Sequence, residues 1–238
     1  MQSNPRSKLN TYISGFVFLT LLLSVVYIAV QWTRAPALPG SAQYEKLKSD
    51  YVLMAVQCLL GMLAMLLPGW LMRRWRVEIP SGMMILYVLF LYAAIYLGEV
   101  RSFYYRIPHW DMILHGFSGG MLGALAFSFV RLLNKSDRVH LILSPLFTAI
   151  FAFSFSITLG VFWEFYEYIV DGMLGLNMQK FLLENGTALI GREALGDTMQ
   201  DLMTDAFGAL FTSIIGYVSL KYKKGWVEKV MLKKQPQR

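Results

Sequence analysis

The sequence predicts an all-α fold, a polytopic membrane bundle of about six transmembrane helices. The first observation is composition, because 56% of the 238 residues are hydrophobic and only 16% are charged. Charged residues make up about a quarter of soluble domains. The second observation is the length of the apolar runs. Several of them reach the roughly 20 residues that a helix needs to cross a bilayer.

Six candidate spans follow one another along the chain. They cover residues 12–32, 51–72, 80–98, 110–132, 142–170 and 197–220. The first span has the position of a signal peptide, but its apolar core is too long for one, so we expect it to remain uncleaved. We expect a single transmembrane domain over 1–238. It would consist of a cytoplasmic N-terminus (1–11), the bundle (12–220) and a basic cytoplasmic tail (221–238).

The charges predict the partners and the orientation. A net charge of +7 would suit a nucleic-acid binder, but the basic residues cluster at the ends of apolar runs, so no nucleic-acid partner is expected. With the N-terminus in the cytoplasm, the inner segments hold about twice as many Lys and Arg as the outer ones, as the positive-inside rule requires. We therefore expect both termini to be cytoplasmic in a plasma or inner membrane. Most acids then lie on the outer side.

Acidic residues gather at the predicted outer ends of four spans. They are Glu99 at the end of the third span, Asp111, with His115, at the start of the fourth, Glu164, Glu167 and Asp171 at the end of the fifth, and Asp197, Asp201 and Asp205 at the start of the sixth. At about 100° per residue, each set lies on one face of its helix. The four helix ends therefore present acids, and one histidine, at a similar membrane depth.

A divalent cation would explain this gathering of acids. An ionised carboxylate costs about 2.5–3.5 kcal/mol near the bilayer centre, and several together also repel one another. A bound cation relieves both costs. The expected ligands are Asp111, His115, Glu164, Glu167, Asp197 and Asp201. Many carboxylates with one imidazole favour Mg²⁺ or Mn²⁺, with Zn²⁺ or Ca²⁺ as alternatives.

Other residues are expected around these ligands. Asp171 and Asp205 would lie behind them, and Arg192 would either hold an anionic substrate or be a solvated loop residue. The competing interpretation is that the acids are structural. The favourable interaction of a negative charge with the helix dipole explains why Asp111 and Asp197 lie at helix starts. It does not explain the acids at the end of the fifth span, where the dipole is unfavourable, or the deeper Asp205.

The predicted function is a metal-dependent hydrolase or transferase acting on a lipid, a lipid-linked phosphate or a membrane peptide. His115, Glu164 and Asp201 are the candidates for catalytic roles. The alternatives are a cation- or proton-coupled transporter or cation sensor, and a non-catalytic assembly protein. Transport needs access from both faces of the membrane, and the inner halves of the spans carry no comparable acids.

Three segments resemble a known family. "WDMILHGFSGG", "GVFWEFYEYIVDGMLGLNMQ" and "DTMQDLMTDAFGAL" are similar to motifs of the YjdF-like bacterial inner-membrane proteins, over roughly residues 80–220. The resemblance implies a bacterial membrane protein without an assigned activity. Besides the acids and His115, it implies that Trp163, Asn177, Gln179 and Thr198 matter.

Overall fold

The computed structural model describes residues 5–37, 46–134, 143–183 and 186–234, and it is built of helices. Within these residues, six helices are long and apolar enough to cross a membrane, which confirms the polytopic all-α prediction. They are α1 (Pro5–Arg34), α2 (Lys48–Trp75), α3 (Ser81–Leu91) continued by η1 (Tyr92–Val100), α5 (Trp110–Asn134), α6 (Pro145–Leu174) and α7 (Gly196–Lys221). The fifth span, α6, ends four residues beyond the predicted end at residue 170. Its predicted start at 142 lies outside the described residues.

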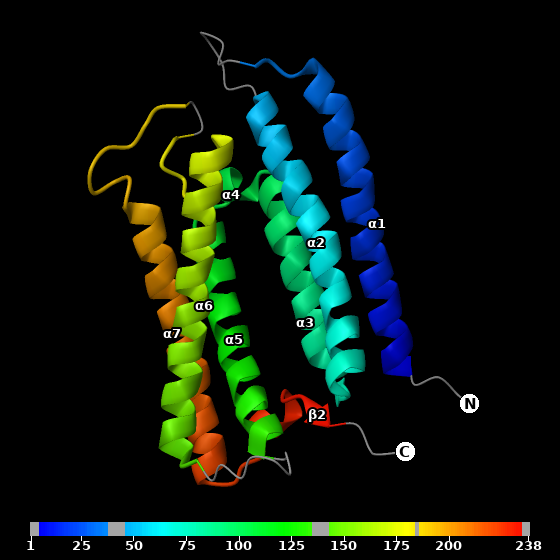
Figure 1. Ribbon diagram of the computed structural model, residues 1–238, viewed down its shortest axis with the longest axis vertical. Helices are drawn as coiled ribbons and strands as arrows, with labels where there is room; N and C mark the ends of the chain where they lie inside the picture. The colour runs from blue at the N-terminus through cyan, green and yellow to red at the C-terminus, as the bar shows by residue number, and fades with distance from the viewer. Residues whose placement is uncertain (1–4, 38–45, 135–142, 184–185, 235–238) are drawn as a thin grey trace.

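The helices form two groups of three that stand side by side (Figure 1). In the first group, α1 packs on α2 and α3 around a cluster that contains Val17, Leu21 and Ile95. Cys58 is fully buried in this cluster, as expected for a packing residue. In the second group, α5 packs closely against both α6 and α7.

Glycines let the backbones of α5 and α7 touch. A Cβ at Gly208 of α7 would overlap the carbonyl oxygen of Gly116, and a Cβ at Gly119 of α5 would overlap the backbone of Asp205. Small residues allow this kind of approach between membrane helices. The contact brings the acidic face of α7 against the His115 face of α5.

The third span changes from an α-helix to a π-helix, η1, over its last nine residues. A π-helix leaves some carbonyl groups without their usual partners and often marks a functional site. Here the indole Nε1 of Trp110 donates to the carbonyl oxygen of Ala93 at 3.3 Å. The chain then turns through Ser102 into the short helix α4 (Phe103–Arg106) and on to α5.

The basic tail folds back on the bundle. Strand β2 (Lys233–Lys234) pairs antiparallel with β1 (Val77–Glu78), and η2 (Val227–Lys229) precedes it. Val227 and Met231 are buried against the second group of helices. The sequence predicts this tail only as a basic cytoplasmic segment, so its packing against the bundle was not predicted. The start of α1 and strand β2 lie at one end of the bundle, called the basic end (Figure 1). The opposite end, with α4 and the loop residues 175–183 and 186–195, is called the acidic end.

Candidate metal centre

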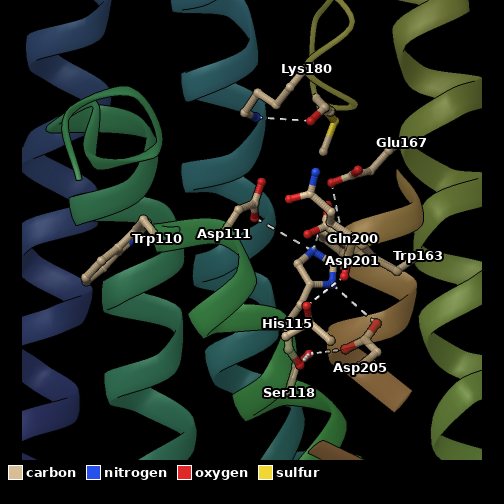
Figure 2. A network of polar contacts seen from close by, with 12 residues as sticks. Trp110, Asp111, His115, Ser118, Trp163, Glu167, Lys180, Gln200, Asp201 and Asp205 are labelled. Carbon is tan, nitrogen blue, oxygen red and sulfur yellow. Dashed lines mark hydrogen bonds and ion pairs between the residues drawn. The ribbon is translucent and has the colours of Figure 1, made fainter. Parts of the chain in front are cut away.

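The centre of the site is His115, one turn into α5 from Asp111. Its Nε2 lies 3.7 Å from Oδ1 of Asp111 and 3.8 Å from Oδ2 of Asp201, which comes from α7. Figure 2 shows the imidazole between these carboxylates. The spacing of four residues puts Asp111 and His115 on one face of α5, and the close α5–α7 contact brings Asp201 to that face.

Asp205 holds the other side of the imidazole. Its Oδ2 lies 3.3 Å from Nδ1 of His115, and its Oδ1 accepts a hydrogen bond of 3.0 Å from the hydroxyl of Ser118. A neutral imidazole that donates its Nδ1–H to Asp205 presents the lone pair of Nε2 to Asp111 and Asp201. A carboxylate behind a histidine is the usual way in which proteins orient a metal ligand. The role of Asp205 behind the ligands stays a prediction.

The three residues have the properties of a metal site. One ligand atom each from Asp111, His115 and Asp201 lies within 4.8 Å of the other two. Distances of 3.7 and 3.8 Å are too long for hydrogen bonds. Oδ2 of Asp201 is buried, and it has no hydrogen-bond partner among the described residues. Because a buried carboxylate oxygen without a partner is costly, a cation at this point would supply what the oxygen lacks.

The carboxylates of α6, the third helix of the second group, approach the same region. Glu164 and Glu167 are both buried, and Oε1 of Glu167 accepts a hydrogen bond of 2.9 Å from the indole of Trp163. In the described part of the chain, both oxygens of Glu164 lack a hydrogen-bond partner, as does Oδ2 of Asp197. These three acids are not members of the 4.8 Å group, and their role as ligands stays a prediction.

Asp171 organises the loop between α6 and α7, which lies at the acidic end and is called the loop below. Its carboxylate accepts hydrogen bonds from the backbone N–H groups of Met178, at 2.8 Å, and Gln179, at 3.0 Å. Asn177 bonds through its side chain to both backbone groups of Leu182, and the amide of Gln179 donates to the hydroxyl of Thr198. Four of the residues singled out by sequence or resemblance thus hold the loop in place. Arg192 is exposed.

Two charged residues at the site were not among the predicted ligands, although Glu99 was counted among the acids at the outer helix ends. Lys180 extends from the loop over the ring of Tyr104, 4.7 Å from its centroid, and donates a hydrogen bond of 3.0 Å to the carbonyl of Met178. Burial alone would lower the pKa of Lys180, but the carboxylates of Glu99 and Asp111 raise it above its usual value. Lys180 therefore stays cationic. Glu99, at the end of η1, accepts a hydrogen bond of 3.3 Å from Gln57 of α2.

A signal for Glu99 existed in the sequence, because it ends the third span at the same depth as the other acids. No comparable signal existed for Lys180. Its position depends on the loop that Asp171 holds.

Comparison with known proteins gives the family of the chain. A family model described as "Predicted membrane protein (DUF2238)" matches residues 16–222. The chain belongs to this family. The match confirms the membrane family of unknown function that the motifs indicated, and the YjdF-like label itself stays a prediction. The DUF2238 model covers most of the first span, the other five spans in full and every residue of the site.

One relative of the chain is an uncharacterised protein from Thermotoga maritima, 30% identical over 143 residues. The alignment covers 59% of this chain and 64% of the relative, so the chain spans less than two thirds of the relative's length. No solved structure matches the chain. The comparisons thus give a multispan membrane family, and the chemistry must be argued from the site.

Proposed function

We propose that the protein binds a divalent metal ion between Asp111, His115 and Asp201 and uses it to hydrolyse or transfer a group of a membrane-embedded substrate. Mg²⁺ or Mn²⁺ suits two carboxylates and one imidazole best, with Zn²⁺ or Ca²⁺ as alternatives. The observation that carries the proposal is a preorganised imidazole beside a buried carboxylate oxygen of Asp201 that has no hydrogen-bond partner among the described residues.

The residues around the centre suit a hydrolysis. A divalent ion there would polarise an oxygen of a phosphate or carbonyl group and lower the pKa of water. Glu164 is a buried carboxylate without a hydrogen-bond partner among the described residues, and it is the candidate base. In phosphoester hydrolysis the water oxygen would bond to phosphorus while the ester P–O bond breaks. The proton of the water would pass to Glu164 and then to the leaving oxygen.

Transport is the second candidate, and one observation favours it. Ser213 is buried two turns below Asp205 on α7, and its hydroxyl has no hydrogen-bond partner in the described residues. A polar path from the acidic end would have to continue past it. Further toward the basic end, however, the hydroxyls of Ser128 and Ser219 accept hydrogen bonds from backbone N–H groups of the folded tail. The tail covers the route, so the enzyme is the better supported proposal.

Metal analysis of the purified protein tests the proposal. We expect bound divalent metal in the wild type, and a reduction of its affinity by roughly tenfold or more in Asp201→Asn, because a ligand is lost. The matched control is Glu193→Gln, since Glu193 is an exposed acid between the loop and α7. The control should keep the metal. A wild type that binds no divalent metal on titration would overturn the proposal.

A further inference from the structure

A cavity of about 540 Å³ lies between the two groups of helices. Residues of α2, α3 and η1 line one side of it, and residues of α5 and α6 line the other. This volume is within the range of roughly 300–1,000 Å³ that is typical of ligand sites. The cavity ends at the candidate metal centre, because Asp111, His115 and Asp205 are part of its wall.

The cavity has one polar end and a long apolar remainder. The polar end holds the carboxylates of Glu99 and Glu167 and the ammonium of Lys180, next to the metal centre. The remainder is lined by apolar side chains that include Ala64, Leu91 and Leu122. On α5 the lining runs from Asp111 to Leu122, which is about 16 Å along a helix that rises 1.5 Å per residue. The cavity therefore reaches about half-way across a hydrocarbon core of roughly 30 Å.

The cavity is covered toward the acidic end. Leu176 and Met178 of the loop are buried in a cluster with Leu53 of α2, and Tyr166 of α6 packs against this cluster. The ammonium of Lys180, a residue of the same loop, lies over the ring of Tyr104. Between α3 and α5, the rings of Phe90 and Phe117 stack with centroids 6.0 Å apart. Side chains of the described residues therefore pack over the cavity in these two directions.

The side between α2 and α6 faces the hydrocarbon instead. Two residues of the cavity wall on this side, Leu60 of α2 and Trp163 of α6, are 45% and 48% exposed. Figure 1 shows α2 and α6 facing each other across the space between the two groups. An apolar cavity does not hold water well, and it gains free energy when an apolar molecule fills it. The occupant that fits a cavity open to the bilayer is the chain of a lipid.

We propose that this cavity binds one hydrocarbon chain of a membrane lipid whose phosphate head lies between Lys180 and the metal centre. The choice of a phosphate head rests on the proposed function. A divalent ion held by carboxylates retains affinity for further oxygen ligands, and the ammonium of Lys180 pairs with phosphate oxygens. The apolar wall determines the depth of the chain, and the polar end determines the position of the ester bond.

Dodecyl phosphate tests the proposal as a single-chain probe, with dodecylamine as the probe of opposite charge. Both are titrated into the metal-loaded protein in nanodiscs, and bound molecules are counted by native mass spectrometry. We expect one dodecyl phosphate per chain and weaker binding of dodecylamine. Ala64→Phe and Leu122→Trp fill the cavity at different points and should each lower the affinity for dodecyl phosphate by about tenfold, because the new ring occupies volume that the hydrocarbon chain would fill; tenfold corresponds to about 1.4 kcal/mol.

The matched controls separate the chain from the head. Leu63 precedes Ala64 in the chain and is 63% exposed on the lipid-facing side. Leu63→Phe should therefore leave the affinity for dodecyl phosphate unchanged. Lys180→Gln should weaken the binding of dodecyl phosphate and should leave the binding of dodecylamine unchanged or make it tighter. Lys224→Gln, at an exposed site at the basic end, should change the affinity for neither probe.

Metal analysis of the same samples distinguishes this inference from the proposed function. Metal-loaded protein whose affinity for dodecyl phosphate is unaffected by both filling variants overturns the cavity as the lipid site and leaves the metal centre in place. Binding that depends on the cavity in a protein without metal overturns the proposed function alone. Tighter binding of dodecylamine than of dodecyl phosphate overturns the assignment of a phosphate head.

Discussion

At the scale of single residues, the account depends on how His115 is held. Asp205 contacts one ring nitrogen at 3.3 Å, and the other nitrogen faces Asp111 and Asp201 at 3.7 and 3.8 Å. In the proposed metal centre, Asp205 would therefore act through the imidazole rather than on the metal ion directly. A residue in that role determines which ring nitrogen is free to bind the metal.

Asp205→Asn tests this positioning role. We expect the affinity for Mn²⁺ to fall by about 10–100-fold, as is typical when a partner behind a metal ligand is changed. Equilibrium dialysis with Mn²⁺ measures the change, with Glu193→Gln as the exposed control. An unchanged Mn²⁺ affinity in Asp205→Asn would show that the imidazole is oriented by other contacts.

The sequence predicted part of this site, and the reason is helical spacing. Asp111 with His115, and Asp201 with Asp205, are each four residues apart and so lie on one helical face. The position of Lys180 could not be predicted from helical spacing. It follows from the two backbone hydrogen bonds that Asp171 accepts from residues seven and eight positions further along the chain. Loop geometry of that kind has no periodic signal in a sequence.

At the scale of elements, glycines place the acidic helices. On α6, Gly160 faces the carboxylate of Asp205, and a Cβ there would lie 2.5 Å from Oδ2 of Asp205. Gly172, further along the same helix, has nothing within 4 Å of its Cβ position. The two glycines therefore make a pair on one helix, one buried against Asp205 in mid-helix and one exposed in the last turn.

Gly160→Ala should destabilise the protein by about 1–3 kcal/mol, because overpacking displaces Asp205. Gly172→Ala should be neutral or stabilising by up to about 1 kcal/mol, since alanine favours the helix. Thermal unfolding in detergent compares the two, and Mn²⁺ affinity should fall only in Gly160→Ala. Equal behaviour of the two variants would argue against a close packing of α6 on Asp205.

The elements themselves were largely predictable, and their irregular parts were not. Long apolar runs predicted six spans, and the six helices are present. The π-helix over Tyr92–Val100 was not predicted, because its residues are as apolar as those of a regular helix. The tail over Val227–Lys234 was not predicted to pack, since its many lysines conceal the few apolar residues that are buried.

At the scale of the whole molecule, the bundle has two groups of helices with a cavity between them. Hydropathy cannot distinguish a residue that faces lipid from one that faces this cavity, because both are apolar. Leu63 and Leu60 of α2 are both exposed leucines, yet only Leu60 lines the cavity. The arrangement of the spans was therefore available only from the structure.

The orientation of the whole molecule is a further prediction. The positive-inside rule assigns the basic end to the cytoplasm. In a Cys58→Ala background, Arg192→Cys at the acidic end should react with an impermeant maleimide in intact cells. Lys224→Cys at the basic end should react only after lysis, because both positions are exposed but face opposite sides of the membrane. Labelling in the reverse order would place the acidic end in the cytoplasm.

The most direct test of the metal centre is electron spin echo spectroscopy of the Mn²⁺-loaded protein. A nitrogen ligand produces a modulation that oxygen ligands do not, and His115 is the imidazole next to Asp111 and Asp201. We predict a histidine nitrogen coupling that is lost in His115→Gln and retained in His109→Gln, which alters an exposed loop histidine. Bound Mn²⁺ without this coupling, or with a coupling that survives His115→Gln, would contradict the account.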